Sequence, residues 1–569
     1  MVNVKNLFGM AVMATALVGC SSNDNLAPDG NDNAGKPGEA YASFRINLPT
    51  TSGTRADDPT PGTPSFDEGT AKEYEVKNGT ILIFDNDGKY VTSAQLGTMN
   101  PWTDVKSDGV TTAAIATVQL TGVKVGGEYK ALVLLNNDVD ELTHKVTLPA
   151  TGVSYADWSK EASNVSVDNY IKTDYIFMAN APKYDATSEP TTLVKVNNIC
   201  ASREEAQAKA ATTVYVERGL AKVTMQDYKT GGYTIADGTT YAKDKVVITD
   251  WKLDVTNKST FPVHQTDGLK SAWDQIWGTG RFFDNTSSSF KRVYWGVDPN
   301  YSGNALQSLT ACQAAFNMIK NSEVKGEAGM EHPQYCLENT FDLANMMQGQ
   351  TTRVVFKAVY TPKALEGTTE KTFYKIGNNT AIWKEADLKQ QIKTVALKAM
   401  NITDAAEQAK YVVKLDATEN NISGAAGQHL IKAENITYTG DAADNKVDPT
   451  VVNTINEKLG LKEEGGKITS GIATYLHGEA YYIARIKHFN ELTPWTAGTP
   501  YNGDNNAFLG RYGVLRNNWY DLSVESISGL GYPEVPEVKP TVPDDENDQY
   551  INVEVKILSW AKRSQSIYL

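Results

Sequence analysis

The clearest pattern along the chain is an alternation of apolar and polar residues close to each end. The alternating apolar positions of the first segment are Ala42, Phe44, Ile46 and Leu48. Those of the second segment are Ile551, Val553, Val555 and Ile557. A two-residue period is typical of a strand with one buried face, because successive side chains point to opposite sides. The pattern therefore predicts one amphipathic strand near each terminus.

The interior of the chain also predicts strands. Apolar runs bounded by Gly, Asn and Asp occur at residues 79–84, 129–136, 214–225, 246–255, 352–360, 479–486 and 519–527, and Gly219 interrupts the third. Helical spacing is rare and occurs in two sets: Leu388, Ile392, Val395 and Ala399, and Leu306, Leu309 and Phe316. Many sequential strands with few helices favour an all-β fold of sandwich domains with minor helices.

Length and charge add to this picture. A chain of 569 residues predicts about two to four domains. The formal net charge of −14 argues against nucleic-acid binding, since an acidic surface repels phosphate. The polar, Gly-rich break at residues 226–245 predicts the domain boundary. It gives an N-terminal sandwich domain over 56–235 and a C-terminal sandwich domain over 236–530.

The N-terminus has the features of an export signal. Lys5 precedes an apolar run at residues 7–18, which is too short to span a bilayer as a helix. The run ends at Cys20, and residues 17–20 (LVGC) resemble a bacterial lipobox. We expect a lipoprotein signal peptide over residues 1–19 and an outer-membrane lipid anchor on Cys20. The alternative is an ordinary signal peptide with an incidental cysteine.

Each terminal strand adjoins a loop rich in proline. Arg55 follows the first strand among small, polar residues and is open to a trypsin-like protease, whereas Arg45 lies inside the strand and would be shielded. Residues 20–55 are therefore predicted to be a removable propeptide. At the other end, residues 531–550 are rich in Pro, Glu and Asp, which predicts an extended, solvated linker to the last strand.

The two ends together suggest how the protein assembles. If cleavage removes the first strand, a sandwich is left with a groove of unpaired backbone groups. The last strand of a second copy can fill such a groove by strand addition, and the head-to-tail contact then builds a filament. The alternative is that the last strand is a permanent edge strand of its own domain.

These features resemble the Bacteroidales fimbrilins, the Mfa1/FimA-like family of type V pilins. The resemblance rests on the lipobox at Cys20 and on the segments SFRINLPTTSGTR, YKALVLLNN, VERGLAKVTM, HGEAYYIARIKH, VLRNNWYDLSVESISGLG and INVEVKILSWAKRSQ. It implies two transthyretin-like β-sandwich domains in tandem. It also implies cleavage between Arg55 and Ala56 by an Arg-specific protease such as a gingipain, followed by donor-strand polymerisation.

The resemblance also sets the expected partners and location. We expect the chain to bind copies of itself, other fimbrial subunits and the Arg-specific protease, and to support adhesion and biofilm formation at the cell surface. An accessible Arg55 and a donor strand favour a stalk subunit. Extra length around residues 365–470 keeps a tip or accessory role open, and the sequence does not identify the adhesion ligand.

Enzymatic and metal-binding motifs are not found. The six histidines show no HExxH spacing, residues 460–467 lack the ending of a P-loop, and no GxSxG elbow occurs. We therefore expect no catalysis, no cofactor and no metal. Three cysteines remain after Cys20: Cys200, Cys312 and Cys336. Three buried free thiols are expected, with a Cys312–Cys336 bridge as the alternative.

A second class of function is a lipid-anchored protein that binds surface glycans. Six tryptophans are candidates for stacking on sugars: Trp102, Trp158, Trp273, Trp277, Trp295 and Trp383. Most tryptophans in a chain of this size are packing residues instead. The two hypotheses differ in the fate of the termini, because a glycan binder keeps residues 20–55 and stays monomeric.

Overall fold

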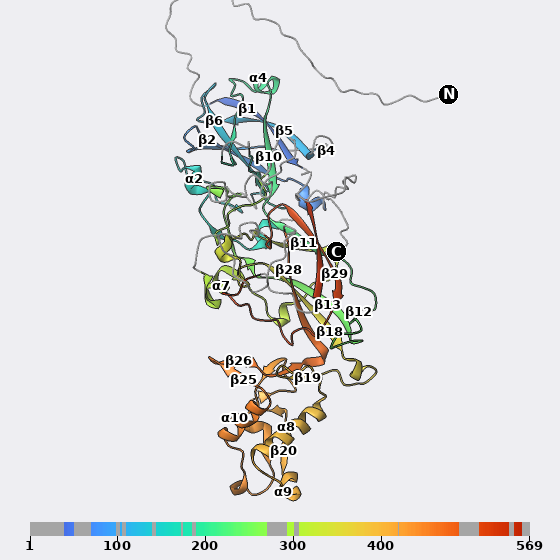
Figure 1. Ribbon diagram of the computed structural model, residues 1–569. Helices are drawn as coiled ribbons and strands as arrows, with labels where there is room; N and C mark the ends of the chain where they lie inside the picture. Colours follow the sequence, from blue (N-terminus) through green and yellow to red (C-terminus); the bar gives the residue numbers. More distant parts are fainter. Residues whose placement is uncertain are drawn as a thin grey trace, which may run out of the picture.

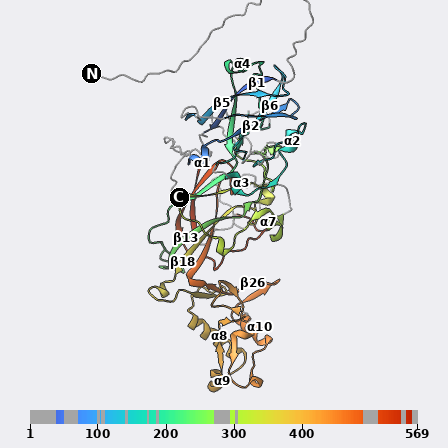
Figure 2. The same ribbon diagram turned by 180° about the vertical axis from the view of Figure 1, so that it is seen from behind.

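The computed structural model describes residues 39–49, 70–97, 103–104, 110–138, 144–171, 175–184, 189–269, 293–300, 306–418, 420–488, 511–544 and 551–559. Strands dominate these residues and helices are few, which confirms the predicted all-β class. The molecule is elongated. The sheet that contains β1 lies at one end, and a unit that carries α8 and α10 lies at the other, in both views (Figures 1 and 2).

The first sheet has the strand order β3-β2-β6-β8-β10-β1-β5-β4, with β9 beside β6. Its strands are β1 Ala40–Pro49, β2 Gly79–Asp85, β3 Tyr90–Gln95, β4 Thr103–Asp104, β5 Val110–Leu120, β6 Tyr129–Leu135, β8 Met178–Asn180, β9 Val194–Lys195 and β10 Thr212–Arg218. Short helices join them: α1 Ala71–Tyr74, α2 Tyr155–Trp158, α3 Val167–Ile171 and α4 Arg203–Ala208. The sheet curls around a core built from β1, β2, β5, β6 and β10.

A second core lies between two four-stranded sheets, of order β17-β11-β29-β30 and β12-β13-β18-β28. Their strands are β11 Ala221–Met225, β12 Tyr233–Thr234, β13 Lys245–Asp254, β17 Gly329–Cys336, β18 Arg353–Thr361, β28 Glu479–Arg485, β29 Asn518–Ile527 and β30 Ile551–Ser559. Trp251 and Phe356 of one sheet pack with Tyr520 and Leu522 of the other. This arrangement is a β-sandwich.

The chain passes from the first sheet to the sandwich at Gly219. The sequence predicted one strand over residues 214–225 with a break at this glycine, but β10 and β11 belong to different sheets. A Cβ on Gly219 would lie 2.8 Å from Tyr170 Cε1 and 2.9 Å from Phe177 Cδ1, so a side chain does not fit there. The change of sheet comes before the break at 226–245, and that break contains β12.

A third core is inserted between β18 and β28 and spans residues 374–472. Its elements are β19 Phe373–Ile376, α8 Glu385–Ala399, α9 Ala405–Ala409, β20 Tyr411–Val413, β23 Gly427–His429, β24 Ile436–Tyr438, α10 Pro449–Lys458, β25 Lys462–Glu464, β26 Lys467–Ser470 and β27 Ile472–Tyr475. The predicted helix at 388–399 is confirmed, with Leu388 and Ile392 fully buried. We call residues 374–472 the inserted unit.

The remaining elements are short. They include the strand pairs β7 Ser163–Asn164 with β15 Ser259–Thr260, β14 Thr256–Asn257 with β16 Phe316–Asn317, and β21 Asp416–Ala417 with β22 Asn420–Asn421. The 3₁₀ turns are Asn321–Glu323, Leu343–Asn345, Lys363–Leu365, Ala433–Asn435, Ala442–Asp444 and Leu476–Gly478. The second predicted helix is α7 Leu309–Ala315. It is shorter than expected, because Phe316 caps it and begins β16.

Candidate functional site

The strand β1 lies inside the first sheet and is paired on both sides. It runs antiparallel to β5 and parallel to β10, with Phe44 opposite Ala116 and Thr212, and Ile46 opposite Ala114 and Val214. The four predicted apolar residues are all buried in the core of that sheet: Ala42, Phe44, Ile46 and Leu48. Removing β1 would therefore leave β5 and β10 each with an unpaired edge above an open core.

The other face of β1 is also covered. The Ser43 hydroxyl donates a 2.8 Å hydrogen bond to the backbone oxygen of Ala206 in α4, and it lies 2.8 Å from Thr117 Oγ1 of β5. Asn47 on the same face is buried as well. The place that β1 occupies is thus a slot between the edges of β5 and β10, with the apolar core on one face and a partial polar cover on the other. We call it the β1 slot.

The residues predicted to be modified on either side of β1 lie outside the described part of the chain. Cys20, Arg55 and Ala56 are among them. Lipidation at Cys20 and cleavage between Arg55 and Ala56 therefore stay predictions. In the described part of the chain, no helix is long and apolar enough to cross a membrane.

The strand β30 lies at an edge of the sandwich. It pairs antiparallel with β29 along its whole length, from Ile551 opposite Ile527 to Ser559 opposite Asn518. Val553 is half-buried against the sandwich core, opposite Val524. The last strand is therefore docked on its own subunit in this structure, and among the described residues one of its edges is paired, with β29.

Residues 531–544, which we call the anchor segment, are not the solvated linker that the sequence predicted. Tyr532 exchanges two backbone hydrogen bonds with Tyr481 of β28, at 2.7 and 2.8 Å. Val538 is 4% exposed, and it packs with Val255 and Phe316. The prediction of a free linker is wrong for this stretch, because its apolar and carbonyl groups find partners far away in the sequence.

A buried ion pair connects α1 with the sandwich. Glu73 lies 2.7 Å from Lys222 Nζ of β11, and both side chains are 2% exposed. The Glu73 carboxylate also accepts a 2.6 Å hydrogen bond from the Tyr335 hydroxyl, and its backbone oxygen accepts one from Arg218 Nε. Lys222 Nζ lies 3.7 Å from the ring centre of Trp519 in β29. One carboxylate thus links the first residues after the predicted processing loop to the sheet that carries β30.

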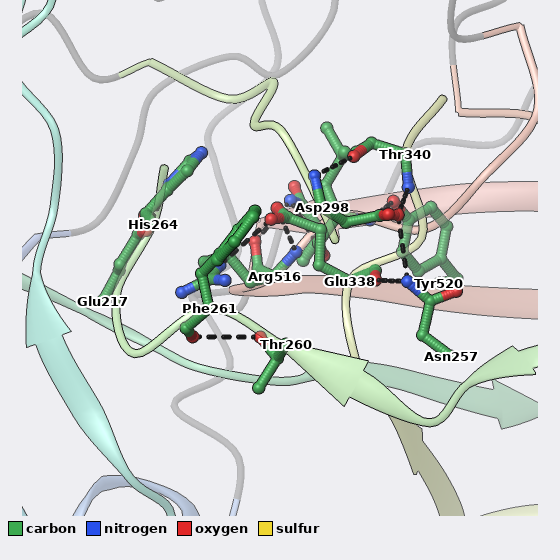
Figure 3. A network of polar contacts seen from close by, with 12 residues as sticks. Glu217, Asn257, Thr260, Phe261, His264, Asp298, Glu338, Thr340, Arg516 and Tyr520 are labelled. Carbon is green, nitrogen blue, oxygen red and sulfur yellow. Dashed lines mark hydrogen bonds and ion pairs between the residues drawn. The ribbon is translucent and has the colours of Figure 1, made fainter. Parts of the chain in front are cut away.

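A second buried polar network connects β10 with loops of the sandwich (Figure 3). His264 Nδ1 lies 2.6 Å from Glu217 Oε1, and Arg516 Nε lies 3.3 Å from Glu338 Oε1. Asp298 is held by hydrogen bonds from Asn257, Thr340 and Asn300. Burial raises the pKa of the Asp298 carboxyl to about 7, because a charge there is poorly solvated.

The sequence did not predict these networks, although it contains a signal for one of them. Glu217 and Arg218 follow the apolar residues 214–216 at the end of β10, and both are almost fully buried. Charged residues are rarely buried without a partner. Two charged residues next to an apolar run in a buried strand therefore indicate that they contact charged groups from other parts of the chain. The partners themselves, such as Arg516, lie about three hundred residues away.

The candidates for enzymatic chemistry occupy structural positions. His488 Nδ1 lies 2.6 Å from the Tyr520 hydroxyl inside the sandwich. Residues 460–467 end in the β25–β26 hairpin, whose Gly465 and Gly466 have positive φ, so no helix follows this glycine-rich stretch. Within the described ranges, no group of three or more His, Cys, Asp and Glu is placed to hold a metal ion.

The cysteines and tryptophans behave as packing residues where they are described. Cys200, Cys312 and Cys336 are buried free thiols, as expected. Burial raises the pKa of Cys336 to about 12, which keeps it protonated and unreactive. Trp158 and Trp295 are buried, and Trp383 packs against the core of the inserted unit. Trp102, Trp273 and Trp277 lie outside the described residues.

The fold and the site define a class: an elongated, β-rich protein whose two terminal strands lie in different sheets. Residues 473–566 match the family described as major fimbrial subunit protein type IV, fimbrillin, C-terminal. The match spans β28, β29, the anchor segment and β30. It confirms the resemblance drawn from the sequence and supports a fimbrillin-like family. The description of this family indicates a fimbrial subunit at the cell surface.

The whole chain has a distant likeness to solved bacterial structures. No curated protein sequence matches it. A candidate cell adhesion protein from Parabacteroides distasonis is 10% identical, with a TM-score of 0.37, and the match covers 92% of this chain and 99% of that one. The tip fimbrial protein Mfa3 from Porphyromonas gingivalis is 10% identical, with a TM-score of 0.30, and the match covers 91% and 100%. Likeness this low carries no argument about function.

Proposed function

We propose that this chain is a fimbrial stalk subunit that polymerises by donor-strand exchange. It is exported as a lipoprotein acylated at Cys20 and anchored in the outer membrane. An Arg-specific protease cuts between Arg55 and Ala56 and releases the lipid together with β1. The last strand of a second copy then enters the vacant β1 slot.

One observation carries this proposal. The strand β1 is buried on both faces and paired along both edges, so its loss exposes a slot that needs a strand with the same apolar period. The apolar residues of β30 recur at every second position, as those of β1 do: Ile551, Val553, Val555 and Ile557. Backbone hydrogen bonds to β5 and β10 would supply affinity, and the alternating side chains would supply register.

The docked position of β30 is compatible with exchange. On its own subunit β30 has one edge paired by described residues, whereas a strand in the β1 slot has two. Exchange therefore adds a second ladder of backbone hydrogen bonds and buries more apolar surface. The equilibrium favours the filament once cleavage has emptied the slot.

The test uses the chain from residue 21 onward with a trace of an Arg-specific protease. We expect a new N-terminus at Ala56 by mass spectrometry and SDS-resistant multimers on an unboiled gel. The variant Arg55→Ala should stay uncut and monomeric, and deletion of residues 549–569 should allow cleavage without multimers. A cut at Ala56 that yields only monomers from the unmodified chain would refute donor-strand exchange.

The inserted unit favours a second candidate, a tip or accessory subunit. It has its own core and lies at the end of the molecule opposite β1, where a tip protein would display a binding surface (Figures 1 and 2). A tip subunit accepts a strand but does not donate one. A chain that caps multimers of a stalk protein without extending them would favour this role. The glycan-binding alternative loses support, because the described tryptophans are packed.

A further inference from the structure

The anchor segment is fixed to the subunit along its whole length. Asn321 Oδ1 accepts a 2.7 Å hydrogen bond from the backbone of Val535, and Arg353 Nη2 donates a 2.6 Å bond to the backbone oxygen of Pro536. Arg353 is itself buried and paired with Asp254 at 2.8 Å. These contacts hold the middle of the segment against η3 (Asn321–Glu323) and the start of β18.

The far end of the segment is held most tightly. The backbone of Gln348 donates a 2.9 Å bond to the oxygen of Val542, and the backbone of Asp544 donates a 3.1 Å bond to Met346. The Thr351 hydroxyl donates a 2.8 Å bond to Asp544 Oδ2, and Asp544 is fully buried. A buried carboxylate with these partners marks Asp544 as a fixed point rather than part of a free linker.

In the part of the chain that the structure describes, the hydrogen bonds of the anchor segment do not involve β30. Within the described residues, its hydrogen-bond partners belong to β18, β26, β27, β28, η3 and the loop at 346–351. The strand β30 pairs with β29, in the opposite sheet of the sandwich. Undocking β30 therefore removes none of these bonds, and the anchor segment can stay bound while β30 leaves.

We propose that the anchor segment remains bound to the donor subunit during strand exchange, so that the free part of the donor begins after Asp544. This inference rests on the proposed function. Only six residues, 545–550, then separate the fixed point from the start of the donated strand. They span at most about 25 Å when fully extended. If the whole of 531–550 came free, the reach would be about 75 Å.

The short reach of residues 545–550 limits how far apart two consecutive subunits can lie. The entrance of the neighbour's β1 slot must come within about 25 Å of Asp544, so consecutive subunits are held in close contact. The anchor segment then transmits tension from the donated strand into β28 and β18. A long free linker would instead give a loosely jointed filament.

A disulfide between the anchor segment and the body tests this inference. Met347 and Pro543 are bridge partners at the end of the segment, so the double variant Met347→Cys/Pro543→Cys can be closed by oxidation. We expect oxidised and reduced protein to give the same yield of multimers after cleavage. Loss of multimers on oxidation, restored by a reductant, would overturn the proposal. Single-cysteine variants control for the oxidant.

A matched disulfide separates this inference from the proposed function. Val524 and Val553 are cross-strand partners, so Val524→Cys/Val553→Cys locks β30 onto β29. Oxidation should abolish multimers in this variant. If it does not, β30 is not the donated strand, and the proposed function fails together with the inference. If oxidation does abolish multimers in this variant, the result with Met347→Cys/Pro543→Cys tests only whether the anchor segment stays bound.

The length of the connection gives a second test. Deletion of residues 546–548 removes half of a six-residue connection, so we expect multimers to be lost while the uncut chain stays folded. Insertion of Gly-Ser-Gly after Asn547 should preserve them. If the whole of 531–550 comes free, a loss of three residues hardly changes the reach. Multimers formed by the deletion variant would therefore overturn the inference.

Discussion

The variant Phe44→Ala should weaken the uncut chain and leave the filament unaffected. Phe44 is fully buried in the core of the first sheet, between β5 and β10. Truncating a buried phenylalanine to alanine costs about 3–5 kcal/mol, from lost apolar contact and the cavity left behind. Under the proposed mechanism the cost falls on the precursor alone, because cleavage removes β1 before multimers form.

The assay is hydrogen exchange of the backbone amides of β5 and β10, before and after processing. In the uncut variant, exchange that requires opening of the first sheet should accelerate by roughly two to more than three orders of magnitude. In multimers, the same amides should exchange as in the unmodified protein. Mass spectrometry must verify that the fragment 21–55 has left.

The matched control lies on the other strand. Val553→Ala should barely change the stability of the uncut chain, because Val553 is half-buried at an edge there. It should weaken multimers by about 2 kcal/mol, because the side chain is then buried in the slot. If Phe44→Ala destabilises multimers as much as the precursor, β1 or an equivalent segment still fills the slot. That result would refute the reasoning.

Three further predictions concern the junctions between the sheets. Glu73→Gln leaves the Lys222 ammonium buried without its ion pair and should lower the free energy of unfolding by about 3–5 kcal/mol. The double variant Glu73→Gln/Lys222→Met should lower it less, and a double-mutant cycle of urea unfolding would measure the difference. Gly219→Ala should lower the melting temperature through a cost of about 1–3 kcal/mol, because the added Cβ meets aromatic rings. The third concerns pH: burial raises the pKa of Asp298 to about 7, so the folded chain holds more protons than the unfolded chain between about pH 4 and 7. The free energy of unfolding should fall by on the order of 4 kcal/mol as pH rises through this window, and then level off. Urea unfolding at several pH values would measure this decrease, which should be smaller in Asp298→Asn.

The sequence predicted the strands that have a strong local pattern. The alternation around Phe44 indicated a strand with one buried face, and the spacing of Leu388 and Ile392 indicated a helix. Both follow from the geometry of a single element. That β1 lies between β5 and β10, with polar Ser43 and Asn47 buried as well, depends on pairing with distant strands. A local pattern does not contain that information.

The anchor segment illustrates what composition misses. Prolines and acidic residues at 531–544 predicted an extended linker, and the segment forms no named strand there. The same composition predicted solvation, which is wrong because Val538 and Asp544 are buried. Their partners, Phe316 in β16 and Thr351 in the loop at 346–351, lie about two hundred residues away in the sequence, and no local pattern links them to this segment. The small strands of the inserted unit, such as β20 and β24, were missed for the same reason.

The way in which the inserted unit joins the sandwich has a practical consequence. Its first and last strands, β19 and β27, pair with each other, from Phe373 opposite Tyr475 to Ile376 opposite Ile472. The chain therefore leaves the sandwich and returns to it at the same place, through this pair of strands. Because the strand pair already brings the two ends together, the length of chain inserted beyond it adds little entropy cost. If the chain polymerises as proposed, a foreign domain with adjacent termini, joined at residues 377 and 471, could take the place of the unit and be displayed in many copies along the filament.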